Sequence, residues 1–208
     1  MDTVLEIFRD HAHAVLPGFS GELGGTVVDL GANEGYYALR LKLLNPTIQV
    51  LAAEPVPENA EGFRENMATN GIDDVTLCET AITHQNGTTR IETLPHVGTV
   101  ASTNMRAFPR PWIKPSEIRT RTVPTMTLEA LLDNHSVTTA EILKVDVEGS
   151  EVDILTSSAA ALRRFRRVVV ECHGAAARQA TRTIMESEGF ATLHAEPKRS
   201  GDLYFLRQ

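Results

Sequence analysis

The chain has 208 residues, 42% of them hydrophobic, and its 27 acidic and 20 basic residues give a formal charge of −7 at pH 7. This length suits one α/β domain over residues 1–208, and the negative charge argues against nucleic-acid binding, which requires clustered Lys and Arg. No apolar run approaches the roughly 20 residues of a membrane span, and the N-terminus lacks the pattern of a signal peptide. The two cysteines, Cys78 and Cys172, cannot form a disulfide framework and suit a reduced, cytoplasmic protein.

Strand and helix signals alternate along the chain. The predicted strands, which are short runs rich in β-branched residues, are 26–31, 48–54, 75–82, 141–149, 167–173, 190–195 and 202–208. The predicted helices are an amphipathic N-terminal helix over 1–16 and the segments 35–44, 57–70, 127–134 (with Thr127 as N-cap), one that starts near residue 150, and 175–188. The alternation predicts an α/β fold with a doubly wound, mostly parallel sheet, whose ligand lies at the carboxyl ends of the strands.

The last two predicted strands differ from the others. The linker EPKRSG (196–201) is too short for a crossover helix, so these strands must pair as a C-terminal antiparallel hairpin. An antiparallel strand in a parallel sheet favours the α/β architecture of methyltransferases over the all-parallel one of dehydrogenases.

One long segment, residues 95–124, shows little periodicity and contains five prolines. We expect a loop there, acting as a lid or as an acceptor-binding loop. Its basic side chains outnumber its one acid, Glu117, which gives residues 95–122 a local charge of +4; they are Arg106, Arg110, Lys114, Arg119 and Arg121. A solvated loop is one interpretation. The other is a lid, closing with Phe108 and Trp112, that attracts an acceptor bearing a carboxylate or phosphate.

A nucleoside-binding signal begins where the first strand ends, in DLGANEG (29–35). Gly31 permits a tight turn and Gly35 close packing of the next helix, but the middle glycine of a GxGxxG dinucleotide fingerprint is missing. This loop suits a ligand with a small polar tail rather than a diphosphate. Glu54, at the end of the second strand, can accept hydrogen bonds from both ribose hydroxyls. Ala81 offers an apolar contact for adenine.

Four segments in this order resemble FkbM-type methyltransferases: DLGANEG (29–35), AEPVPEN (53–59), KVDVEGSE (144–151) and VVVECH (168–173). The resemblance runs from about Thr26 to the last strand, and residues 95–124 are its least family-like part. It implies a Rossmann-like class I methyltransferase fold, S-adenosylmethionine (SAM) as cofactor, and usually methylation of a hydroxyl on a natural product, glycan or lipid-like acceptor. The residues that it implies for the cofactor site are Asp29, Gly31, Asn33, Gly35, Glu54 and Ala81.

Charged residues alternate in KVDVEG (144–149), so that Lys144, Asp146 and Glu148 are predicted on one face of the strand. Such a row is costly in a central strand unless its members are paired or lie at the open end. Asp146 falls where the strand meets the ligand crevice, and we expect it to orient the acceptor or polarise its hydroxyl. For Glu148 and Glu151, capping of the following helix is at least as good an interpretation.

A second candidate is His173, which follows Glu171 at the end of the neighbouring strand. Imidazole titrates near neutral pH, so His173 is a candidate general base on an acceptor hydroxyl, and a structural role is equally open. The remaining histidines, at positions 11, 13, 84, 96, 135 and 194, receive no role.

These residues favour in-line methyl transfer from SAM to an oxygen of a small-molecule acceptor, with a nitrogen acceptor as an alternative. A metal-assisted version adds a divalent cation held by Asp146 with Glu171 or His173. A nicotinamide oxidoreductase is disfavoured by the missing glycine. A nucleoside-binding regulatory domain without catalysis would leave Asp146 and His173 without a role.

Overall fold

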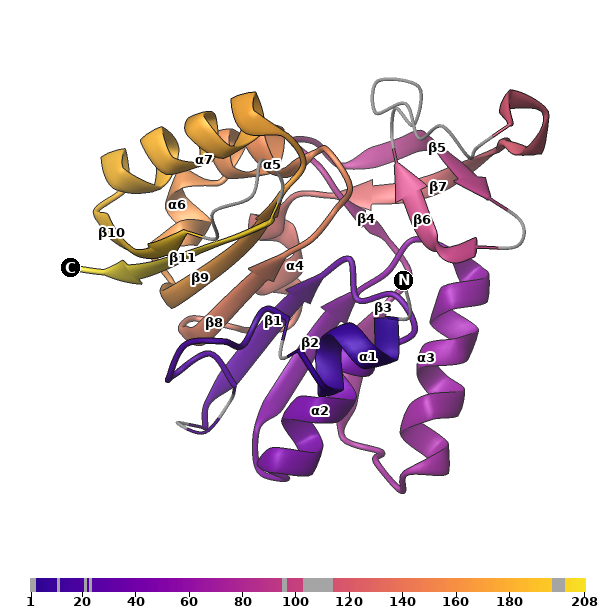
Figure 1. Ribbon diagram of the computed structural model, residues 1–208, viewed down its shortest axis with the longest axis horizontal. Coiled ribbons are helices and arrows are strands. Elements are labelled where there is room, and N and C mark those ends of the chain that lie inside the picture. Colours follow the sequence, from indigo (N-terminus) through magenta and orange to yellow (C-terminus); the bar gives the residue numbers. More distant parts are fainter. Residues whose placement is uncertain are drawn as a thin grey trace.

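A computed structural model describes residues 3–10, 12–20, 22, 24–94, 97–102, 114–195 and 201–208. Within these ranges the strands form a seven-stranded sheet, of order β10-β11-β9-β8-β1-β2-β3, and a four-stranded sheet, of order β4-β7-β5-β6 (Figure 1). The strands of the larger sheet are β1 (Thr26–Leu30), β2 (Gln49–Ala53), β3 (Val75–Cys78), β8 (Ala140–Val145), β9 (Phe165–Cys172), β10 (Phe190–Ala195) and β11 (Gly201–Arg207). Those of the smaller sheet are β4 (Ala81–Ile82), β5 (Gly87–Leu94), β6 (Val97–Ser102) and β7 (Arg119–Met126).

The larger sheet has the predicted mixed topology. Strands β3, β2, β1, β8 and β9 pair in parallel, and β11 pairs antiparallel with both β9 and β10. The strand order reverses direction along the chain at β1 and β8, which is where an α/β sheet opens a crevice at its carboxyl ends. The predicted doubly wound fold with a C-terminal antiparallel hairpin is therefore confirmed.

Helices cover both faces of this sheet, as Figure 1 shows. They are α1 (Thr3–Phe8), α2 (Tyr36–Leu44), α3 (Pro57–Thr69), α4 (Leu128–Asn134), α5 (Glu151–Ser157), α6 (Ala159–Leu162) and α7 (Ala175–Ser187). Helices α1–α3 pack on the face that carries Val27, Ile142 and Val169, and α4–α7 pack on the face that carries Val28 and Leu143. Successive strand residues point to opposite faces, so each central strand contributes to both cores. The predicted N-cap Thr127 accepts a hydrogen bond from Ala130 N at 3.1 Å.

The prediction of a loop over 95–124 is wrong for most of its described residues. Residues 97–102 form β6, residues 115–117 form a 3-10 turn, and β7 begins at Arg119 and pairs antiparallel with β5. Of the β7 side chains, those of Val123 and Thr125 are buried, and the others are exposed or partly exposed. The strand therefore lacks the apolar run by which a buried strand is recognised in a sequence. The predicted lid residues Arg106, Phe108, Arg110 and Trp112 lie outside the described residues.

Two other predicted elements are shorter in the structure. The N-terminal helix ends at Phe8 rather than at residue 16, and the chain then turns so that His13, with a φ of 61°, enters the interior. The predicted strand 75–82 divides at Glu79 and Thr80. Its first part, β3, stays in the larger sheet, whereas β4 pairs with β7, because the hydroxyl of Thr80 donates to the carbonyl of Pro124 at 3.2 Å and ties the chain to the smaller sheet.

Among the described residues, the helices are all too short or too polar to cross a membrane.

Gly35 is the residue on which the packing of α2 against α3 depends. Its φ is +80°, and a Cβ at this position would lie 2.5 Å from the Phe63 ring of α3. We expect Gly35→Ala to lower the free energy of unfolding by about 2–4 kcal/mol, because left-handed strain and overpacking add. Gly71→Ala is the matched control, since Gly71 has a φ of +68° but no atom within 4 Å of its Cβ position. Urea unfolding that gave equal losses for both variants would show that the Phe63 contact is unimportant.

Candidate active site

A pocket open to solvent lies at the carboxyl ends of β1, β2 and β8, where the smaller sheet meets the larger one. Its lining combines polar and apolar residues: Gly31, Asn33, Ala53, Glu54, Pro55, Asn59, Thr80, Ala81, Ile82, Thr83, Ile91, Asp146, Val147, Glu148 and Ser150. The pocket therefore has the position predicted for the ligand of an α/β sheet.

The loop after β1 forms one wall of the pocket. Gly31 has a φ of +76°, and a Cβ on it would overlap the carbonyl oxygen of Asp146 at the end of β8. Asp146 N in turn donates to Leu30 O at 3.0 Å. Gly31 is thus needed for the close approach of two strand ends, which brings the loop and Asp146 to the same side of the pocket.

Glu54 follows β2 and is 4% exposed. One carboxylate oxygen accepts from Asn33 N at 2.9 Å, and the other accepts from Val56 N at 2.9 Å and from the amide of Asn59 at 3.2 Å. Burial raises the pKa of Glu54, and these hydrogen bonds oppose the rise. The carboxylate therefore ties the loop after β1 to the start of α3 while facing the pocket. Asn59 had no signal in the sequence beyond its place as the last residue of AEPVPEN.

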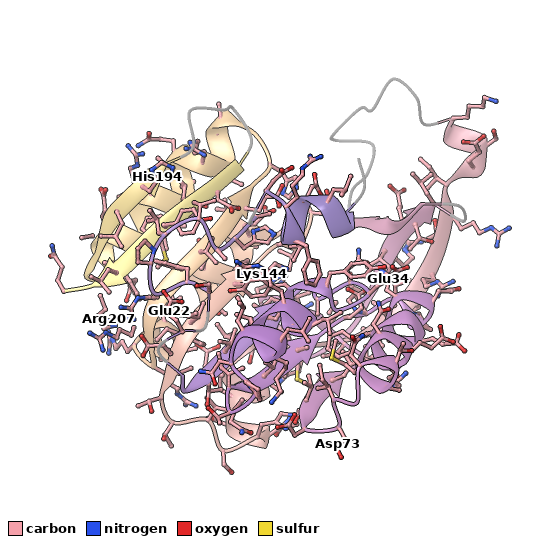
Figure 2. The ribbon with its side chains drawn as sticks, turned by 60° about the horizontal axis from the view of Figure 1, so that its bottom comes forward. Glu22, Glu34, Asp73, Lys144, His194 and Arg207 are labelled. Carbon is pink, nitrogen blue, oxygen red and sulfur yellow. The ribbon has the colours of Figure 1, made fainter. Side chains whose placement is uncertain are left out.

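Beneath the pocket lies a buried ion pair between Lys144 on β8 and Asp29 on β1. Lys144 Nζ lies 2.9 Å from Asp29 Oδ1, donates to Gly31 O at 3.1 Å, and lies 3.6 Å from Asp146 Oδ2. Burial lowers the pKa of Lys144, but the carboxylates of Asp29 and Asp146 raise it by more, so the ammonium stays charged. Figure 2 shows Lys144 deep in the molecule, whereas Asp73 and Arg207 lie at its periphery. The charged row in KVDVEG is therefore tolerated through pairing.

The predicted cofactor residues divide into two groups. Gly31, Asn33, Glu54 and Ala81 line the pocket. Asp29 and Gly35 do not belong to its lining: Asp29 is fully buried against Lys144, and Gly35 faces Phe63. Both support the glycine loop from behind.

Of the two predicted catalytic residues, Asp146 lines the pocket and His173 does not. Strand β8 ends at Val145, and Glu148 then adopts a φ of 53°, so the predicted alternation stops before it reaches Glu148. His173 lies just after β9, with Nδ1 2.5 Å from Glu151 Oε1 and Nε2 3.3 Å from Glu148 Oε2. Burial lowers the pKa of His173, but Glu151 and Glu148 raise it to about 9. At neutral pH His173 is therefore an imidazolium, and it must lose that proton before it can accept another.

Three carboxylates line up across the neighbouring strands β8, β9 and β11. Asp146 directly follows Val145, which pairs with Val170, and the next residue, Glu171, pairs with Asp202 of β11. The carboxylate of Asp146, followed by burial, raises the pKa of Glu171 to about 7. Asp202 had no signal in the sequence, because nothing local shows that the last strand would insert beside β9.

His13 is the residue that sequence reasoning missed. Its Nδ1 lies 3.0 Å from Asp202 Oδ1, and its Nε2 lies 3.7 Å from Asp146 Oδ2 and from Glu171 Oε2. Burial lowers the pKa of His13, but Asp202 raises it to about 9, and His13 lowers the pKa of Asp202 to about 2 against the effect of burial. The contact joins residues 189 positions apart, so no local pattern could have placed it.

Comparison with known proteins agrees with this geometry. Residues 29–194 match the methyltransferase FkbM domain. The chain is 27% identical over 159 residues to the 2-O-methyltransferase NoeI of Sinorhizobium fredii, an alignment that covers 70% of this chain and 62% of NoeI, less than two thirds of that relative. It is 26% identical over 205 residues to Methyltransferase 1 of Beauveria bassiana, covering 92% of this chain and 81% of the relative.

Solved structures show the same fold. A methyltransferase FkbM from Methylobacillus flagellatus superposes with a TM-score of 0.54 at 16% identity, covering 88% of this chain and 43% of that one. Magnesium protoporphyrin IX methyltransferase from Synechocystis, solved with bound SAM, superposes with a TM-score of 0.52 at 12% identity, covering 99% of this chain and 76% of that one.

The family resemblance seen in the four sequence segments is thereby confirmed. Because the matched segment 29–194 spans most of the chain and contains every strand end that lines the pocket, the chain belongs to the FkbM methyltransferase family.

Proposed function

We propose that the chain transfers a methyl group from SAM to a hydroxyl of a small-molecule, natural-product or glycan acceptor. The observation that carries this proposal is the pocket, in which Glu54, the Gly31 loop and Asp146 converge from three adjacent strand ends. The match of residues 29–194 to a methyltransferase family supports the reaction type. The 27% identity to NoeI, a 2-O-methyltransferase, supports oxygen over nitrogen as the methyl acceptor.

The lining of the pocket fits SAM in three places. Glu54 would accept from the ribose hydroxyls at the end of β2. The apolar side chains of Ala81, Ile82 and Ile91, from β4 and β5, would contact the adenine. Gly31 and Asn33, which line the pocket beside Asp146, would lie along the amino-acid tail. When bound, SAM supplies a methyl group made electrophilic by the neighbouring sulfonium.

The task left to the chain is alignment in a site closed to water. We assign the orientation of the acceptor hydroxyl to Asp146, which lines the pocket and is held in place by the Leu30 backbone and by Lys144. His173 remains the predicted proton acceptor, a role open only to its neutral form, because its pKa is raised to about 9. Its contacts with Glu148 and Glu151 support an orienting role for those two residues, since a base is positioned by its partners.

Replacement of Glu54 tests the cofactor site. We expect Glu54→Gln to raise the Kd for S-adenosylhomocysteine (SAH) about 10- to 100-fold, because a hydrogen bond to a charged group contributes about 1.5–3 kcal/mol. Titration calorimetry measures the effect, and Glu61→Gln, an exposed acid on α3, is the matched control. Equal SAH affinity in Glu54→Gln and wild type would remove Glu54 from the site. Binding of NAD in place of SAH would contradict the proposed cofactor.

Two variants separate binding from chemistry. Asp146→Asn and His173→Gln should keep SAH affinity within about threefold while lowering the rate of methyl transfer, by about 100-fold or more if His173 takes the proton. Transfer from labelled SAM to polyhydroxylated acceptors provides the assay. Unchanged turnover in His173→Gln would make that histidine structural, and SAH binding without turnover in the wild type would favour a regulatory nucleoside-binding domain.

The charge of the acceptor is a separate prediction, which starts from the basic residues of segment 95–122. In the described part of that segment, Arg121 donates to Glu58 at 2.6 and 2.7 Å, and Lys114 Nζ lies 3.9 Å from Glu117 Oε1, so the test uses Arg106 and Arg110. For an acceptor with a carboxylate or phosphate, we expect KM to rise with ionic strength and in Arg106→Glu/Arg110→Glu. Arg163→Glu/Arg166→Glu, the same charge change at two exposed arginines outside the segment, is the control. A KM insensitive to salt and to these changes would show that the acceptor is neutral.

A further inference from the structure

We infer that His13, Asp146 and Glu171 form a binding site for a divalent cation beside the proposed SAM pocket. One potential ligand atom from each of these residues lies within 4.8 Å of the other two. His13 Nε2 is 3.7 Å from both Asp146 Oδ2 and Glu171 Oε2, longer than a hydrogen bond and short enough for a common ion to replace the direct contacts. The imidazole of the site is thus His13 rather than His173, which is held by Glu151 and Glu148.

His13 has the features of a metal ligand whose orientation is fixed in advance. Its side chain is 6% exposed, its Nδ1 lies 3.0 Å from Asp202 Oδ1, and its backbone N donates to Asp202 Oδ2 at 2.9 Å. Asp202 therefore sets the ring orientation and leaves Nε2 to face the two carboxylates, the arrangement in which a carboxylate supports a metal-bound histidine. The φ of 61° at His13 is an uncommon conformation for a non-glycine residue, and such outliers concentrate at functional sites.

The charges around the cluster also suit a cation. Asp29, Asp146, Glu171 and Asp202 supply four carboxylates to this part of the molecule, and Lys144 makes its shortest contacts with Asp29 and Gly31 rather than with Asp146. The side chains of Asp146 and Glu171 are 25% and 34% exposed, so the cluster is open to solvent on the side of the carboxylates. A buried histidine paired with acids for stability alone would not require two partly exposed carboxylates at equal distance from one nitrogen.

The nature of the three ligands indicates the class of ion. One imidazole nitrogen with two carboxylates suits Mn²⁺ or a similar first-row divalent cation better than Ca²⁺, which takes oxygen ligands. Three protein ligands leave positions for water and for an oxygen of the acceptor, and Asp146 belongs to both the cluster and the pocket. The inference rests on the proposed function for this last point: an acceptor hydroxyl held there would be polarised next to the methyl donor.

Direct metal binding tests the site without SAM or acceptor. Mn²⁺ is titrated into the full chain and followed by electron paramagnetic resonance and calorimetry. We expect one Mn²⁺ per chain, with affinity lowered at least about tenfold in His13→Gln and Glu171→Gln, and about 10- to 100-fold in Asp202→Asn, whose side chain orients His13 and is not one of the three ligands. His84→Gln, which replaces an exposed histidine after β4, should bind Mn²⁺ as the wild type does.

The outcomes separate this inference from the proposed function. Because Glu171 is partly exposed, we expect Glu171→Gln to fold even if His13→Gln, a change at a buried residue, prevents folding. Thermal melting and SAH affinity verify that the variant is folded. Absence of Mn²⁺ binding at millimolar concentration, or equal affinity in Glu171→Gln and wild type, overturns the cation site. If SAH binds in that case, the methyltransferase proposal stands. Mn²⁺ binding that depends on Glu171, in a chain that does not bind SAH, would support the cation site and refute the cofactor proposal.

Discussion

The buried contact between Lys144 and Asp29 is the interaction on which the rest of the site depends. It joins the two central strands β1 and β8, whose residues Asp29 and Lys144 pair in register, with a distance of 2.9 Å between the charged atoms. The same ammonium holds the carbonyl of Gly31, so the loop that lines the pocket is fixed from below. Removing either partner would leave the other charge buried and unpaired, at a cost of about 3–5 kcal/mol. The ion pair thus links the stability of the sheet centre to the shape of the pocket.

The second constraint is the alignment of strand ends. Because β8, β9 and β11 are neighbours, the residues at their ends form a row of carboxylates that runs away from the pocket, from Asp146 through Glu171 to Asp202. Such a row of like charges is unfavourable unless positively charged groups lie beside it. The ammonium of Lys144 lies 3.6 Å from Asp146 at one end of the row. The ring nitrogens of His13 lie within 3.7 Å of all three carboxylates. The N-terminal segment is therefore part of the site, although it precedes residues 29–194 that match the family.

The smaller sheet completes the pocket from the other side. Ile82 of β4 and Ile91 of β5 give it apolar surface, and Thr80 ties β4 to β7. Because β4 is two residues long and pairs only with β7 in this sheet, the position of Ala81 and Ile82 depends on β7, more than 40 residues later. Segment 119–126 therefore supports, through packing, the side of the pocket proposed for adenine.

Features that depend on neighbouring residues could be predicted from the sequence. Apolar runs, glycines at strand ends and Thr127 before a helix predicted the central strands, most helices and the C-terminal hairpin, because each depends on neighbouring residues. The same local reasoning placed Gly31, Glu54, Ala81 and Asp146 at the crevice, and the family resemblance added Asn33; all five line the pocket, since a strand end in an α/β sheet already implies a place there. Which charged groups meet depends on contacts between distant parts of the chain. Examples are the pairing of Asp29 with Lys144, the burial of His13 against Asp202, and the pairing of β4 with β7. In each of them, pairing between distant residues offsets the cost of removing polar or charged groups from water, and no local pattern encodes that pairing.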